Sequence, residues 1–143
     1  MIFLKKTALI SVSSMQSNKK EDIVEVVTPG SFYKKENSYY VVYDETELSG
    51  MEGTTTTFKI NCKDNKFSLI RMGTTNAKME FQKAKDDIVL YNTPYGPLEL
   101  KIETRELNIN VDDEGGDVVI KYNLTFTGQK PQKTILKINI KAQ

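Results

Sequence analysis

The sequence predicts an all-β fold formed by a single domain over residues 1–143. Three observations predict it. Apolar residues recur at every second position, most clearly in 118–126 and 136–140, as in strands that bury one face. Turn-forming Asn, Asp and Gly lie between these runs at short intervals, and no window shows a sustained helical period. About ten short strands with hairpin connections result, which is typical of a sandwich or an up-and-down barrel.

The first segment is predicted to be a strand, because Ala8, Ile10 and Val12 fall on one face of an extended chain. Two lysines ahead of an apolar stretch also suggest a signal peptide. Serines interrupt that stretch, however, and no clean cleavage site follows. No apolar run reaches the ~20 residues of a membrane-spanning helix. We therefore expect a cytoplasmic protein that does not enter a membrane.

Two segments in the first half of the chain are predicted to be strands of different kinds. Residues 24–28 show the ordinary alternation of a half-buried strand. Residues 39–43, Tyr-Tyr-Val-Val-Tyr, instead place large side chains on both faces, which a strand with one wet face should not have. Tyr40 and Val42 on the outer face must then be covered by another part of the chain or by a second subunit. A homodimer contact is one of these two interpretations.

The second half of the chain contains a rigid turn and a change of phase. In residues 93–97, Thr-Pro-Tyr-Gly-Pro, the prolines restrict the backbone and the glycine can adopt a positive φ. This turn either sets the register of a hairpin or holds Tyr95 over one mouth of the barrel. In residues 98–111 the apolar positions change from even to odd numbers. An extra residue must be absorbed there, so a β-bulge or bend is predicted at 104–106.

Several short motifs follow one another in an order that is found in a bacterial family. They are Tyr39 to Glu45, Thr54 to Lys59, Leu69 to Gly73, Lys78-Met79 with Phe81, Thr93 to Gly96 with Leu98 and Leu100, and Gly116 to Tyr122. On these motifs the chain resembles the YwiB-like family of uncharacterised β-barrel proteins. The resemblance implies a lipocalin-like, calycin-type antiparallel barrel of about eight to ten strands. It supplies no activity or catalytic residues to carry over, so function stays open, and the chain departs from the family pattern in a longer loop at Leu48–Gly53.

Arg71 is the most informative candidate for a binding residue. It shares a face with the apolar residues of its strand, so alternation directs its guanidinium into the barrel. A buried arginine must be paired, and its planar fork suits a carboxylate or a phosphate. One interpretation is an anion-binding residue inside a cavity. The others are an internal salt bridge to Glu45, Glu47 or Glu80, and a guanidinium that reaches the barrel mouth.

Three tyrosines and a glutamate complete the candidate ligand site. Tyr43 and Glu45 share a face near a strand end, Tyr122 lies on the apolar face of a later strand, and Tyr95 would join from its turn. Aromatic rings with polar tips suit a partly apolar ligand, although in a small barrel they also serve as core. The leading hypothesis is a small-molecule-binding module with a partly apolar, anionic ligand. The alternative is a filled barrel that acts as a structural or regulatory interaction protein through its outer tyrosines.

The composition excludes several classes of chemistry. The chain has no histidine and one cysteine, Cys62. The commonest general base, histidine-activated nucleophiles, internal disulfides and cysteine-based zinc sites are therefore excluded. The acidic hairpin 112–117 lacks the ligand spacing of an EF-hand, and a net charge of +1 gives no bulk attraction to nucleic acid. We therefore predict no enzyme activity, no cofactor, no metal and no nucleic-acid partner.

Overall fold

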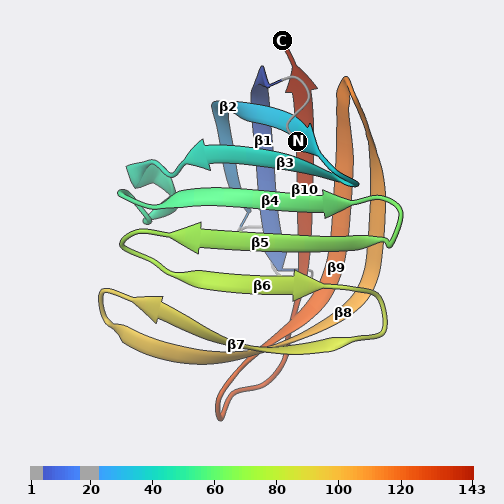
Figure 1. Cartoon of the computed structure of the whole chain (residues 1–143). Helices are drawn as coiled ribbons and strands as arrows, with labels where there is room; N and C mark the ends of the chain where they lie inside the picture. The colour runs from blue at the N-terminus through green and yellow to red at the C-terminus, as the bar shows by residue number, and fades with distance from the viewer. Residues whose placement is uncertain (1–4, 17–22) are drawn as a thin grey trace.

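The computed structural model describes residues 5–16 and 23–143 as one antiparallel sheet of ten strands, curled into a nearly closed barrel (Figure 1). The strands are β1 (Lys6–Gln16), β2 (Val24–Lys35), β3 (Ser38–Asp44), β4 (Thr55–Asn61), β5 (Lys66–Met72), β6 (Ala77–Phe81), β7 (Asp86–Thr93), β8 (Gly96–Asp112), β9 (Gly115–Phe126) and β10 (Gln132–Ala142). One 3₁₀ turn, η1 (Glu47–Ser49), lies between β3 and β4. The predicted fold class, an all-β antiparallel up-and-down barrel, is confirmed.

The first described segment is a strand, as the alternation predicted. Ala8 and Ile10 of β1 are fully buried, whereas Leu9 between them is exposed. Residues 1–4, where the signal-peptide interpretation begins, lie outside the described residues. Within the ranges that the structure describes, no helix is long and apolar enough to cross a membrane.

The sheet closes through its first and last strands and has one seam. β1 pairs with both β2 and β10, so that Ala8 faces Ala142 across the closure. β6 and β7 are the two ends of the sheet. In the described part of the chain they share one isolated bridge, in which the Asn76 amide donates to the Asn92 carbonyl at 2.8 Å and the reverse bond measures 2.9 Å. The seam is therefore the least hydrogen-bonded line in the wall.

Two local features shape the long strands. The register of β8 against β9 shifts between Thr104 and Glu106, which confirms the predicted bulge, and the extra residue, Arg105, is exposed. At Gly30 the chain of β2 passes so close to β3 that a Cβ would lie 2.7 Å from the Val42 carbonyl oxygen. Only glycine fits there. In Figure 1, β3 to β6 run across the direction of β1, β10 and β9.

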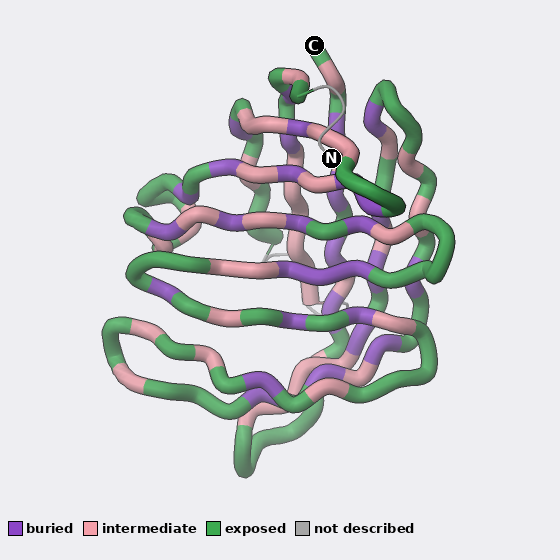
Figure 2. Tube along the Cα trace, viewed as in Figure 1, coloured by how far each residue is buried: buried purple, intermediate pink, exposed green. Residues whose placement is uncertain are grey.

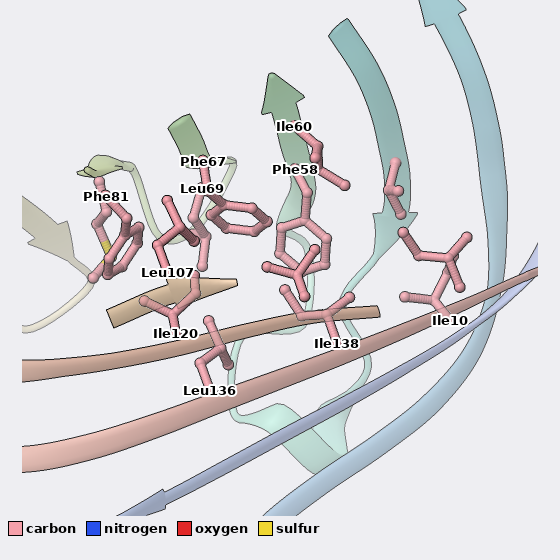
Figure 3. Packing of buried hydrophobic residues seen from close by; sticks show 14 of the residues in the cluster. Ile10, Phe58, Ile60, Phe67, Leu69, Phe81, Leu107, Ile120, Leu136 and Ile138 are labelled. Carbon is pink, nitrogen blue, oxygen red and sulfur yellow. The ribbon is translucent and has the colours of Figure 1, made fainter. Parts of the chain in front are cut away.

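The interior is filled at one end of the barrel, which we call the packed end. It is the end of the β2–β3, β4–β5, β6–β7 and β8–β9 turns. Buried and exposed residues alternate along the strands (Figure 2). The largest completely buried side chains outside the cavity described below are Ile10, Phe32, Ile60, Phe67, Phe81, Ile102, Ile120, Ile138 and Ile140. Figure 3 shows residues from β4 and β5 packing against residues from β9 and β10.

Candidate functional site

The opposite end of the barrel, the open end, holds a cavity of about 430 Å³. This volume falls within the range of small-molecule sites, about 300–1,000 Å³. The apolar part of the wall includes Phe58, Leu69, Met79, Leu100, Leu124 and Leu136. Five larger polar side chains also line it, namely Tyr43, Glu45, Arg71, Tyr91 and Tyr122. The structure therefore brings together four of the five ligand-site residues that the sequence suggested.

Arg71 reaches the cavity from the C-terminal end of β5, where it is the penultimate residue. Phe67 and Leu69 of the same strand are buried, and Arg71 follows on the same inward face. Its side chain is 17% exposed. The direction that alternation predicted for this guanidinium is therefore the direction that the structure shows.

The Arg71 guanidinium is only partly satisfied by the protein. Its Nη1 donates to the Tyr91 hydroxyl at 3.0 Å. Its Nε lies 4.0 Å from Oε2 of Glu45, an ion-pair distance that is too long for a hydrogen bond. Nε is buried and has no hydrogen-bond acceptor among the residues that the structure describes. Because an unpaired buried donor costs about 1–3 kcal/mol, this atom marks where a ligand oxygen would be stabilised.

Glu45 is fixed in the cavity wall rather than free to turn to solvent. Its side chain is 2% exposed, and Oε2 accepts a hydrogen bond from the Thr56 hydroxyl. Its backbone amide donates to the Thr54 carbonyl at 2.8 Å, which holds the chain just beyond β3 against β4. The predicted internal pair of Glu45 and Arg71 thus exists, but as a long contact that leaves the arginine an open donor.

Burial makes two tyrosines of the cavity weaker acids. Burial raises the pKa of Tyr122 to about 12, and the neighbouring Arg71 opposes that shift. The pKa of Tyr43 is also raised, first by burial and then by the negative charge of Glu45. Both hydroxyls therefore keep their protons at neutral pH, and each can donate to an acceptor on a ligand.

Two residues of the site have no counterpart in the sequence prediction. The Tyr91 hydroxyl contacts Met51 Sδ at 3.6 Å, and Met51 follows η1 in the β3–β4 loop. That loop is anchored, because the hydroxyl oxygens of Thr54 and Thr74 lie 2.9 Å apart. Tyr91 could have been predicted from the sequence, since it shares one face of β7 with the buried Val89. Met51 lies in a loop, where no periodicity indicates direction.

Tyr95 does not line the cavity, so the structure does not join it to the other four candidate ligand residues. It is 99% exposed, at the two-residue turn between β7 and β8. The Thr93 hydroxyl accepts a hydrogen bond from the Tyr95 amide at 3.1 Å and donates to the Gly96 carbonyl at 2.9 Å. These bonds lock the turn with the ring directed to solvent. The other interpretation, a stiff hairpin that sets register, agrees with the pairing of Thr93 and Gly96.

The outer face of β3 is covered by a side chain of the neighbouring strand. The Tyr40 ring stacks on Tyr33 of β2 with the ring centroids 5.2 Å apart. Lys5 Nζ lies 6.0 Å from the centroid of the Tyr33 ring. Tyr40 and Val42 are both half-buried in the single chain. Cover from within the chain is therefore present, and a homodimer contact at these two residues stays a prediction.

Comparison with known proteins gives three matches. A family model described as a domain of unknown function (DUF1934) matches residues 10–138. The uncharacterized beta-barrel protein YwiB of Bacillus subtilis (strain 168) is 25% identical over 112 residues, which cover 78% of this chain and 76% of that protein. The crystal structure of the ywiB protein from Bacillus subtilis superposes with a TM-score of 0.85 at 21% identity, over 99% of this chain and 95% of that one. This structural match shows the fold.

Proposed function

The chain belongs to the family described as a domain of unknown function (DUF1934), and from the geometry of its own cavity we propose that it is a non-catalytic binding protein. The ligand is a small molecule with an apolar body and an anionic head that accepts hydrogen bonds. One observation carries the proposal. In the wall of a mostly apolar cavity, the buried Nε of Arg71 has no acceptor within the described part of the chain. A ligand oxygen at this atom would complete the guanidinium.

The two chemical halves of the ligand have separate partners. Its head would accept from Arg71, with the protonated hydroxyl of Tyr122 in the same cavity as a further donor. Its body would pack on the apolar wall, for example on Leu69 and Leu136. Burial of apolar ligand area contributes about 25 cal/mol per Å², so the body supplies affinity and the head supplies orientation.

The non-catalytic part of the proposal is supported by the chemistry of the side chains. The chain has no histidine. Cys62 follows β4 at the packed end, away from the cavity, and burial raises the pKa of its thiol, which disfavours the nucleophilic thiolate. The Glu45 carboxylate already accepts from Thr56. The first segment has no clean signal-peptide pattern, and on this ground we propose that the binding takes place in the cytoplasm.

Fluorescence titration with anilinonaphthalene sulfonate tests the proposal, because this probe joins an apolar ring system to one anionic group. We expect the wild-type protein to bind one probe molecule at saturation. Arg71→Met should weaken binding by about tenfold or more, since the head loses a charged donor. Arg105→Met is the matched control, because Arg105 is the other arginine and is exposed on the bulge of β8. It should bind like the wild type.

Near-ultraviolet circular dichroism establishes that each variant keeps its fold. If Arg71→Met lowers the stability too far, Val12→Phe supplies a second test, since Val12 lines the cavity and a larger ring would occupy it. Equal affinity of the wild type and both cavity variants would overturn the proposal. Native mass spectrometry of protein purified from its own source adds an independent readout, with a small acid released on denaturation as the expected result.

A further inference from the structure

The cavity is electrically balanced, and this balance restricts its ligands. Of the described residues that line it, Arg71 and Glu45 are the two that carry a charge. The side chain of Glu45 is buried at 2% exposure and that of Arg71 is half-buried at 17%, and their two charges sum to zero. In a mostly apolar wall, each further charge must be matched locally, because burying an unmatched charge is costly. The net charge of the head group therefore matters more here than on an exposed surface.

The position of Glu45 beside the open donor sharpens this restriction. Oε2 of Glu45 lies 4.0 Å from the Nε of Arg71, which has no acceptor in residues 5–16 and 23–143. A ligand oxygen that accepts from this Nε would therefore lie beside a carboxylate oxygen. The Glu45 carboxylate cannot easily move away from the ligand. The Thr56 hydroxyl donates a hydrogen bond to it, and the Glu45 backbone amide donates one to the Thr54 carbonyl. With Arg71 and Glu45 summing to zero, a monoanionic head brings the site to a net charge of −1, with its oxygen bonded to Arg71. A dianionic head brings it to −2, with its second charge beside Glu45.

We propose that Glu45 is a specificity-determining residue that admits a head group with one negative charge, of the carboxylate class, and rejects dianionic phosphate monoesters. This inference rests on the proposed function and adds the charge of the head group to it. Arg71 attracts the head group, and Glu45 sets the limit on its charge. A pocket with Arg71 alone would accept either anion.

The test compares three probes that share one alkyl chain, namely decanoate, decyl phosphate and decanol, in displacement of anilinonaphthalene sulfonate. The titrations are made at about pH 8, where a phosphate monoester carries close to two negative charges. We expect wild-type protein to bind decanoate at least about tenfold more tightly than decyl phosphate. Glu45→Gln should raise the affinity for decyl phosphate by about tenfold or more and abolish the preference. The affinity for decanol should change little.

Glu47→Gln is the matched control, since it removes the same charge two positions along the chain at an exposed site of η1. It should keep the wild-type preference for decanoate. A second variant leaves Glu45 in place. Met51→Lys adds a cation next to Tyr91, whose hydroxyl lies 3.6 Å from Met51 Sδ. It should improve binding of decyl phosphate more than binding of decanoate.

The outcomes separate the two proposals. Binding of decanoate with a preference that neither Glu45→Gln nor Met51→Lys changes would overturn the role of Glu45 and leave the proposed function standing. Failure of the wild type to bind any of the three alkyl probes, together with failure to bind the fluorescent probe, would overturn the proposed function itself. A wild-type preference for decyl phosphate would also contradict the inference.

Discussion

The two ends of the barrel are built from the same strands, yet one is filled and the other is hollow. On β1, Ile10 is completely buried at the packed end, and Val12, the next inward residue, lines the cavity. On β10, Ile138 and Leu136 show the same contrast. A filled core and a ligand cavity are therefore not exclusive hypotheses for this barrel. On these strands the packed core and the cavity are separated by a single inward position.

A row of aromatic rings marks the border between the two ends. Ring centroids lie 5.6 Å apart between Tyr43 and Phe58, 5.4 Å between Phe58 and Phe67, 6.0 Å between Phe67 and Phe81, and 5.0 Å between Phe81 and Tyr122. Phe67 and Phe81 belong to the packed end, and the other three line the cavity. The row gives the cavity a rigid floor, because aromatic pairs at these distances are mutually stabilising.

The largest expected effect comes from truncating matched residues of β10. Ile138→Ala should lower the free energy of unfolding by about 4–5 kcal/mol, because it opens a void in a filled core. Leu136→Ala should cost about 2–3 kcal/mol, since Leu136 already borders empty space and has fewer packing contacts to lose. Equilibrium denaturation in urea measures both. Equal losses would show that the two ends do not differ in packing.

Alkaline pH tests whether the open end is shielded from water. The pKa of Tyr122 is raised from 10.0 to about 12, so the native state keeps a proton that the unfolded chain loses. The stabilisation is complete below pH 10.0 and is lost as the pH rises through about 12. Over this window the free energy of unfolding should fall by about 1.4 kcal/mol per pH unit.

Urea unfolding across that window, in wild-type protein and in Tyr122→Phe, isolates this contribution. The variant lacks the ionising group, so its free energy of unfolding should fall less steeply with pH. Other buried tyrosines leave a residual slope in both proteins, since the pKa values of Tyr39 and Tyr43 are also raised. Parallel slopes would mean that water reaches the Tyr122 hydroxyl freely.

The smallest effects, about 0.5–3 kcal/mol, are expected from substitutions that enlarge an inward side chain. Here the direction of the change in stability distinguishes the two ends. Val12→Phe should stabilise the protein by about 0.5–2 kcal/mol, because the new ring fills part of the cavity. Ile10→Phe, one inward position away, should destabilise it by about 1–3 kcal/mol through overpacking. Thermal unfolding of both variants under one condition gives the signs. Destabilisation by both substitutions would contradict a hollow open end.

Features that depend on alternation could be predicted from the sequence. The inward direction of Arg71 and the bulge at Thr104–Glu106 follow from counting positions, since a strand has a period of two residues. Pairing of Arg71 with Glu45 was also among the possibilities, because few acidic residues share the interior. The direction of Tyr95 could not be obtained in this way, since turn geometry rather than period sets it.

The open donor of Arg71 is a property that no sequence pattern shows. It depends on the 4.0 Å separation from Glu45, and this separation results from how β5 and the segment after β3 are placed. It also depends on Tyr91, which comes from β7 on the far side of the seam. Distances between side chains on separate strands arise only when the barrel closes. The sequence therefore predicts which residues meet, but not which of their atoms lack partners.

The closure of the barrel through β1 and β10 has a consequence for the folding kinetics. Every other ladder joins strands that are adjacent along the chain, so these hairpins can form early through local contacts. The β1–β10 ladder instead brings together the two most distant strands, with Ala8 opposite Ala142. Two meanders, β1 to β6 and β7 to β10, must therefore find each other before the cavity exists. We therefore expect the cavity to form late in folding, when this long-range ladder closes.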